Sequence, residues 1–250
     1  MKALWCAGRQ LWVDDALAEL AEPRVHVAAF TEAPRDTPLL YLRWVRGLKG
    51  TELRAPMGDA TVRLDGDVLE VDFEDGIFRA ELTLRLAYAV MTERLGGVLI
   101  HASAVAFGER GLVASGVSGT GKSTLARHAL ASGAELLSDE IAQLFPDGRL
   151  AGTPFRSDTE QPSTPRLVRA AYFAGVRKAD TEALEPLSSL DATLLALSQC
   201  FEAPVVPATR VESRRRLMAF LGATQLGTIA CRNHPATGDF VRALLGGETR

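Results

Sequence analysis

Short hydrophobic runs separated by glycine, proline and aspartate dominate the first 80 residues, and their alternation predicts β-strands. The clearest turn signal is Asp65-Gly66-Asp67, because Asp-Gly is strongly favoured in tight hairpins. Helical periodicity first appears over Ala80 to Leu95, which ends at the Gly96-Gly97 pair. We therefore expect a β-rich N-terminal region over residues 1–80, with strands at Leu4 to Val13, Arg24 to Phe30, Leu39 to Val45, Thr61 to Leu64 and Val68 to Phe73.

Beyond that helix, strand and helix patterns alternate, which is typical of an α/β domain and predicts one over residues 81–250. A strand at Val98 to Phe107, a four-residue turn at Gly108 to Gly111 and a strand at Leu112 to Ser115 form an expected antiparallel hairpin. A helix of about ten residues from Lys122 stops near Gly133. The remaining expected elements are a strand over 134–138, a hairpin of 142–145 and 149–151, strands over 170–175 and 226–231, and helices over 189–200, 211–221 and 236–245.

Composition narrows the class of protein. The chain has 250 residues, of which 47% are hydrophobic and 24% charged, as in globular domains. A net charge of −3 argues against a nucleic-acid or anionic-membrane partner, and no apolar run is long enough to span a bilayer. The three cysteines lack the spacing of a disulfide framework or zinc site. We expect a cytoplasmic protein, and the oligomeric state stays open.

The strongest chemical signal is a glycine loop between a strand and a helix. Residues 116–123 read Gly-Val-Ser-Gly-Thr-Gly-Lys-Ser and match the P-loop pattern G-x-x-x-x-G-K-[ST]. The glycines let several backbone N–H groups surround one anion, and the helix adds the positive end of its dipole. Lys122 can reach the outer phosphates, and the Ser123 hydroxyl is placed to bind Mg²⁺. The pattern predicts an ATP and Mg²⁺ site made by Gly116, Ser118, Gly119, Thr120, Gly121, Lys122, Ser123 and Thr124.

Two acids are spaced to return to this loop. The helix falls about 15 Å and the next strand climbs about 16 Å in a right-handed crossover, so Asp139 and Glu140 reach the height of the phosphates. Either acid can bind Mg²⁺, or one can accept a proton from an attacking hydroxyl. If hairpin partners have residue numbers summing to 219, His101 lies beside Ser118 and near Asp139. It can shuttle a proton there, or it is a buried histidine satisfied by a backbone carbonyl.

The polar stretch from Gly152 to Pro165 has little apolar periodicity and is the best candidate for a lid. Its Arg156 could clamp a transferring phosphoryl group or a substrate carboxylate. A solvated arginine on a loop is the alternative.

Three segments in this order, Leu99 to Ser103, Gly116 to Ser123 and Leu137 to Glu140, resemble the HPr kinase group, whose P-loop fold is shared with ATP-dependent phosphoenolpyruvate carboxykinase. The resemblance implies a kinase core of that type behind the β-rich N-terminal part. It implies that Asp139 is the catalytic base, that His101 is its partner, and that Lys122 and Ser123 bind phosphate and metal. Glu140 stands where the family has a second aspartate, which implies a metal ligand.

Residues 152–156 and 170–173 resemble short stand-alone HPr kinase-like proteins, some of which modify ribosomal peptides. The chain lacks a counterpart of the Glu-Ile-Arg-Gly-rich signature used for phosphorolysis, so the reverse reaction is not expected.

The leading hypothesis is an ATP- and Mg²⁺-dependent kinase that transfers the γ-phosphate to a serine-type hydroxyl of a peptide or protein. Asp139, His101 and Lys122 are its candidate catalytic residues. The alternatives are a small-molecule kinase and a nucleotide-dependent binding switch without transfer.

Overall fold

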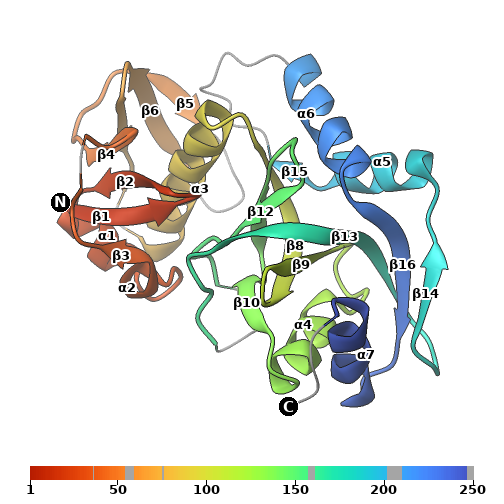
Figure 1. Cartoon of the computed structure of the whole chain (residues 1–250). Coiled ribbons are helices and arrows are strands. Elements are labelled where there is room, and N and C mark those ends of the chain that lie inside the picture. Colours follow the sequence, from red (N-terminus) through yellow and green to blue (C-terminus); the bar gives the residue numbers. More distant parts are fainter. Residues whose placement is uncertain (36, 54–58, 75, 157–160, 202–209, 247–250) are drawn as a thin grey trace.

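The structure is a computed structural model that describes residues 1–35, 37–53, 59–74, 76–156, 161–201 and 210–246. Within these ranges the chain forms two β-sheets and seven helices, so the expected α/β class is confirmed. Figure 1 shows the first sheet, built by the N-terminal residues, beside the second sheet, which is flanked by the later helices. None of the described helices is both long and apolar enough to cross a bilayer.

The first sheet has seven strands in the order β3-β1-β2-β4-β7-β6-β5. The predicted hairpin around Asp65-Gly66-Asp67 is confirmed. The single strand expected over Leu4 to Val13 is wrong, because Ala7 and Gly8 take positive φ and fold the segment into a hairpin. The strands are β1 (Lys2–Cys6), β2 (Arg9–Val13), β3 (Thr31–Glu32), β4 (Leu40–Trp44), β5 (Thr51–Leu53), β6 (Ala60–Asp65) and β7 (Val68–Asp72).

Two short helices accompany this sheet, α1 (Asp15–Ala21) and α2 (Val27–Phe30). The strand expected over Arg24 to Phe30 is therefore wrong. Its alternating apolar residues do not pair along a sheet. Only Val25 forms an isolated bridge, with Phe155 far along the chain, and Val27 and Phe30 are buried from a helical turn.

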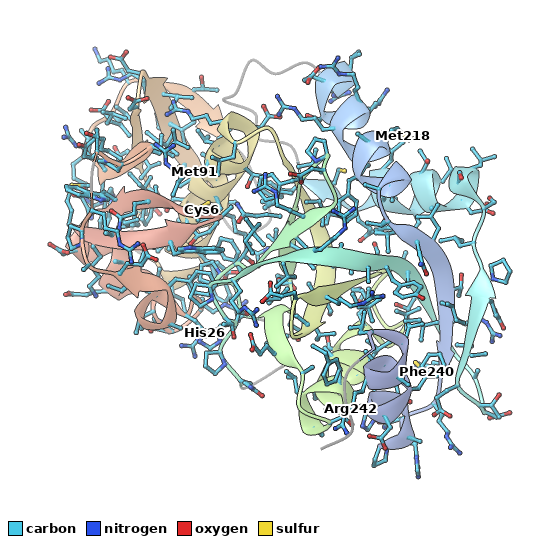
Figure 2. The ribbon with its side chains drawn as sticks, in the orientation of Figure 1. Cys6, His26, Met91, Met218, Phe240 and Arg242 are labelled. Carbon is cyan, nitrogen blue, oxygen red and sulfur yellow. The ribbon has the colours of Figure 1, made fainter. Side chains whose placement is uncertain are left out.

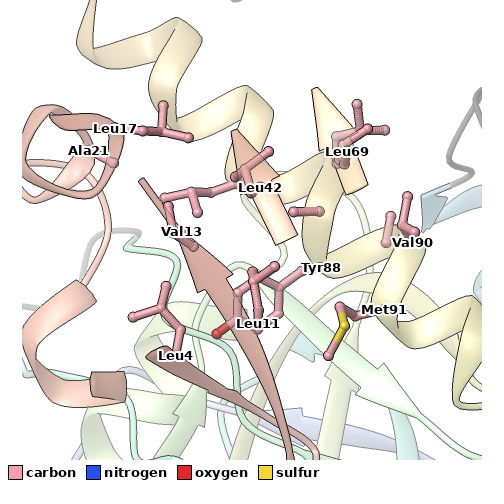
Figure 3. Close-up of a cluster of buried hydrophobic side chains, with 14 of the residues drawn as sticks. Leu4, Leu11, Val13, Leu17, Ala21, Leu42, Leu69, Tyr88, Val90 and Met91 are labelled. Carbon is pink, nitrogen blue, oxygen red and sulfur yellow. The ribbon is translucent and has the colours of Figure 1, made fainter. Parts of the chain in front are cut away.

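Helix α3 (Ile77–Arg94) joins the two halves of the molecule. It packs against β1 and β4 of the first sheet and against β8 of the second, so it is buried on most of its circumference. The Tyr88 hydroxyl donates to the Trp5 carbonyl oxygen at 2.7 Å. Figure 3 shows Tyr88, Val90 and Met91 in one hydrophobic cluster with Leu4 and Leu11. The predicted boundary at residue 80 stays a prediction, although the core shared with the first sheet continues along α3.

The second sheet carries helices on both faces. The strands are β8 (Val98–Phe107), β9 (Arg110–Ser115), β10 (Glu135–Ser138), β11 (Ile141–Leu144), β12 (Arg149–Ala151), β13 (Leu167–Lys178), β14 (Ala183–Pro186), β15 (Cys200–Phe201) and β16 (Gln225–Cys231). The helices are α4 (Lys122–Ala131), α5 (Ser189–Ser198), α6 (Arg210–Gly222) and α7 (Ala236–Leu244).

Alternate residues of these strands feed two separate cores. On β9, Leu112 and Ala114 pack with α4 and α7, whereas Val113 packs with α5 and α6 on the other face. Figure 1 shows α4 and α7 together on one side of the sheet and α5 and α6 on the other. Five strands also close a ring of pairings, in which β8 pairs with β9, β9 with β13, β13 with β12, β12 with β11 and β11 with β8.

The hairpin of β8 and β9 differs from the expected one in register. Partners sum to 217 instead of 219, because Phe107 pairs with Arg110 across a two-residue loop. Gly108 supplies the positive φ of +57° that such a loop needs. Gly111 belongs to the strand, where an added Cβ would lie 2.8 Å from Leu150 Cδ2. Its glycine serves close packing and not the turn.

The strand that carries the two acids does not lie directly beside the P-loop strand. β8 lies between them, since Ala104 pairs with Val113 of β9 and with Ser138 of β10 on opposite edges. β10 and β11 both pair antiparallel with β8, and Asp139 and Glu140 form the break between these two strands. The strand that returns toward the loop is therefore β10, which is separated from the P-loop strand β9 by β8.

Candidate functional site

The loop from Gly116 to Gly121 leaves the end of β9 and leads into α4. Gly116, Gly119 and Gly121 have φ of +153°, +82° and +109°, which residues with a Cβ rarely adopt. At Gly116 a Cβ would also lie 2.9 Å from Thr120 Oγ1. Gly121 is the N-cap of α4, whose first residue is Lys122 as predicted. The loop therefore has the backbone of an anion cradle at a helix N-terminus.

A pocket of about 340 Å³ opens over this helix start. Most of the predicted loop residues line it, but Gly116 and Thr120 are not among its lining residues. Its walls are His101, Ser118, Gly119, Gly121, Lys122, Ser123, Thr124, Arg127, Asp139, Glu140 and Lys178. The loop, both acids and His101 are thus brought together, although they come from three separate segments of the chain.

Two cations of this pocket were not predicted from the sequence, Arg127 and Lys178. Lys178 is the last residue of β13, which runs parallel to β9. The last residue of β9, Ser115, pairs with Gly175 of β13. The three further residues of β13 reach about 10 Å beyond, to the height of the loop. Ligands of α/β sheets bind at such carboxyl ends. Neither side chain forms an ion pair with another described residue.

The Lys122 ammonium folds back onto its own loop. Nζ donates to the carbonyl oxygens of Gly116 at 2.7 Å and Val117 at 3.3 Å. Burial lowers the pKa of Lys122 from its ordinary value, and the negative charges of Glu140 and Asp139 oppose that shift. The lysine side chain is therefore held against its own loop and near both acids.

Asp139 is 2% exposed and lies beside Ser103 of β8. The Ser103 hydroxyl donates to Asp139 Oδ1 at 2.6 Å, within the range of a charge-assisted hydrogen bond. Ser103 was not among the predicted site residues. The available signal was its position two residues after His101, since alternate residues of a strand share one face.

His101 has a different neighbour from the expected one. It pairs with Ile141 across β8 and β11, and its Nδ1 lies 3.7 Å from Glu140 Oε1. The register predicted from the sequence placed it beside Ser118 and near Asp139, whereas the pairing of β8 with β11 brings it next to Glu140. His101 and Asp139 still line the same pocket. The His101 backbone N–H donates to the Gln199 carbonyl oxygen at the end of α5.

Glu140, the predicted metal ligand, is engaged by an arginine of α3. Arg85 Nη1 and Nη2 lie 3.2 and 3.3 Å from Glu140 Oε1. Among the described residues, no group of three or more His, Cys, Asp and Glu side chains is arranged to hold a metal. Ser123 lines the pocket at the position that the P-loop pattern assigns to Mg²⁺, with both acids in the same pocket.

Arg156 does not line the loop pocket. Its Nη2 lies 4.0 Å from Glu22 Oε1, and its backbone N–H donates to the Arg24 carbonyl oxygen at 3.2 Å. Just before it, His26 N–H donates to the Pro154 carbonyl oxygen, so the start of the predicted lid is tied to the N-terminal part. Figure 2 labels His26 at this border. Residues 157–160 of the predicted lid lie outside the described residues.

A larger cavity of about 650 Å³ lies in the N-terminal part, lined by residues of β5, β6 and β7 and by Arg46 and Arg79. It holds none of the predicted site residues. The loop pocket remains the candidate site because the glycine cradle, the helix start and the buried carboxylate converge there and nowhere else among the described residues.

The chain matches no protein-family model and no curated protein. The function must therefore be argued from the pocket itself.

Proposed function

We propose that the chain is an ATP- and Mg²⁺-dependent phosphotransferase that acts on a serine-type hydroxyl of a peptide or protein, in the manner of the HPr kinase group. One observation carries the proposal: the P-loop cradle, Lys122 and the buried carboxylate of Asp139 line a single pocket. Phosphoryl transfer needs this combination, because it depends on holding a polyphosphate and placing an acceptor in line with it.

The nucleotide half of the site is formed by the loop and the start of α4. The backbone N–H groups of Ser118 to Lys122 hold the phosphates, and the Lys122 ammonium, now bonded to carbonyl oxygens of its own loop, moves to the outer phosphates. The Ser123 hydroxyl would supply an oxygen ligand for Mg²⁺, which would neutralise charge on the phosphate oxygens. Arg127 and Lys178 add positive charge at the rim of the pocket.

The acceptor half is formed by Asp139 and His101. Asp139, fixed by the Ser103 hydroxyl, accepts the proton of the acceptor hydroxyl. The acceptor oxygen forms the new bond to the γ-phosphorus, while the bond between that phosphorus and the bridging oxygen breaks and its electron pair stays on ADP. His101 lines the same pocket and assists Asp139 at the acceptor.

The experiment is incubation of the purified chain with Mg²⁺ and ATP labelled on its γ-phosphate, with pools of serine-containing peptides and of small hydroxylated metabolites as acceptors. Label that becomes covalently attached to peptide supports the proposal. Label on a metabolite would instead indicate a small-molecule kinase. ATP binding without transfer to either pool would indicate a binding switch. The Lys122→Ala variant is the control for contaminating kinases.

A further inference from the structure

Helix α3, which joins the two halves of the molecule, reaches the candidate site through a line of charged side chains. Arg24 Nε lies 2.9 Å from Glu81 Oε2, and the other oxygen of Glu81 accepts from Arg85 Nε at 3.0 Å. Arg85 in turn donates to Glu140 Oε1 with both terminal nitrogens. His101 Nδ1 lies 3.7 Å from that same oxygen. Charges therefore alternate from Arg24 at the border of the two parts to the wall of the pocket.

The centre of this line is held from several sides. The Glu81 carboxylate is fully buried and the Arg85 side chain is 11% exposed, so the two ions depend on each other for solvation. The Arg85 guanidinium also lies over the Phe155 ring, 5.2 Å from its centroid, and Phe155 packs edge-on against Tyr88 of α3. A planar fork fixed by two carboxylates and a ring has little freedom to change position.

We propose that Arg85 is a positioning residue of the site: it fixes Glu140 against His101, so that the linking helix α3 is required to complete the catalytic pocket. The role of Glu140 is then to hold His101 in place, because its negative charge is already balanced by the Arg85 guanidinium. This reassigns Glu140 from the metal ligand that the sequence resemblance implies to the group that orients His101. The functional consequence rests on the proposed phosphotransferase activity, whereas the position of His101 can be measured without it.

The first test reads His101 directly. The chain contains four histidines, so the ring nitrogens of histidine-labelled protein can be resolved by NMR and assigned with a His101→Gln variant. In Arg85→Gln and in Glu140→Gln, the His101 ring resonances should move, while those of His128 and His234 stay, because these two lie on α4 and before α7. Arg85→Lys keeps the charge without the fork and should give an intermediate shift. Arg94→Gln is the matched control, since Arg94 lies on the same helix and pairs with Asp67 away from the pocket.

Unchanged His101 resonances in the Glu140→Gln variant would overturn the proposal. Glu140 is partly exposed, and its substitution leaves the Arg85 to Glu81 pair in place, so this variant stays folded even where Arg85→Gln does not. The combined Arg85→Gln/Glu140→Gln variant should displace His101 no further than either single change, because both remove one interaction.

The second test separates this role from nucleotide binding. Arg85→Gln should lower kcat by about tenfold or more while KM for ATP changes by less than about twofold, since only acceptor positioning is affected. The Mg²⁺ concentration for half-maximal ATP binding should be the same in Glu140→Gln and in the parent. A raised Mg²⁺ requirement, or a raised KM with unchanged kcat, would contradict the reassignment. If instead the parent neither binds nor turns over ATP while His101 still shifts, the proposed function fails and the positioning contact stands.

Discussion

Replacing Asp139 by asparagine removes one charge and almost no volume from the wall of the pocket. The side chain is buried, and an asparagine there would keep an oxygen that can accept from the Ser103 hydroxyl, which lies 2.6 Å from the aspartate. The variant therefore separates the shape of the residue from its ability to take a proton. If Asp139 is the base, turnover should fall and ATP binding should persist.

The magnitudes place the two effects on different scales. Loss of a general base lowers turnover by about 10²- to 10⁴-fold, which corresponds to about 3–5 kcal/mol in the barrier. The charge-assisted hydrogen bond from Ser103 becomes a neutral one, which costs the fold roughly 1–2 kcal/mol. Relief from burying a charge offsets part of this cost. A domain stable by roughly 5–15 kcal/mol therefore stays folded while turnover collapses.

The assay measures transfer of the γ-phosphate and, separately, the affinity for Mg²⁺-ATP by calorimetry. Asp139→Asn should lose at least about 10²-fold in kcat, with an ATP Kd within about threefold of the parent. Ser103→Ala is the matched control, because it keeps the carboxylate and loses only its anchoring bond, so it should lose about tenfold or less. Near-normal transfer by the asparagine variant, or a defect that lies wholly in ATP affinity, would refute the assignment of Asp139 as base.

Two further predictions concern charges that the sequence did not single out. Lys178→Ala should weaken ATP binding by roughly three- to tenfold at low salt and less at high salt, because salt screens the charge of an exposed lysine in the pocket. The control variant Lys49→Ala, in the N-terminal part, should leave ATP affinity unchanged. Equal losses of affinity in the two variants would contradict a local contact between Lys178 and ATP. Burial and the nearby Arg156 charge lower the pKa of His26 from 6.5 to about 4, so the unfolded chain binds a proton between these values and the folded chain does not. Stability should therefore fall as pH drops through this window, by up to about 3 kcal/mol. Urea unfolding of His26→Gln should lack that part of the slope, and a slope equal to that of the parent would contradict the shift.

Local chemistry predicted much of the second half of the molecule. The loop glycines, the start of α4 at Lys122 and its end before Gly133 follow from backbone preferences of a few adjacent residues. The hairpin around Pro146 to Gly148 could be predicted in the same way, from its turn-forming residues. The position of Asp139 and Glu140 near the loop could be predicted from the lengths of helix α4 and strand β10 alone. These lengths do not depend on whether β8 lies between β9 and β10.

Features set by distant contacts could not be predicted in this way. Gly111 looks like part of a turn, and only the packing of Leu150 and Val168 against it shows that it belongs to a strand. The pairing of His101 with Ile141 of β11, which brings it next to Glu140, was not predicted either, because the two residues lie 40 positions apart in sequence. Likewise Arg85 lies 55 residues before Glu140, and no local pattern links the two. The run from Arg24 to Phe30 alternates like a strand, yet its burial is achieved by a helical turn and one bridge.

The central claim is that the loop from Gly116 to Ser123 holds the phosphates of ATP, and calorimetric titration of Mg²⁺-ATP into the chain and into Lys122→Ala tests it most directly. The lysine is 7% exposed and its ammonium donates to carbonyl oxygens of the same loop, so its removal chiefly affects contacts within that loop. We predict saturable binding with one site per chain, weakened at least about tenfold in the variant, because a phosphate chain loses its main mobile cation. Absence of binding by the parent, or equal affinity of the two proteins, would contradict the account.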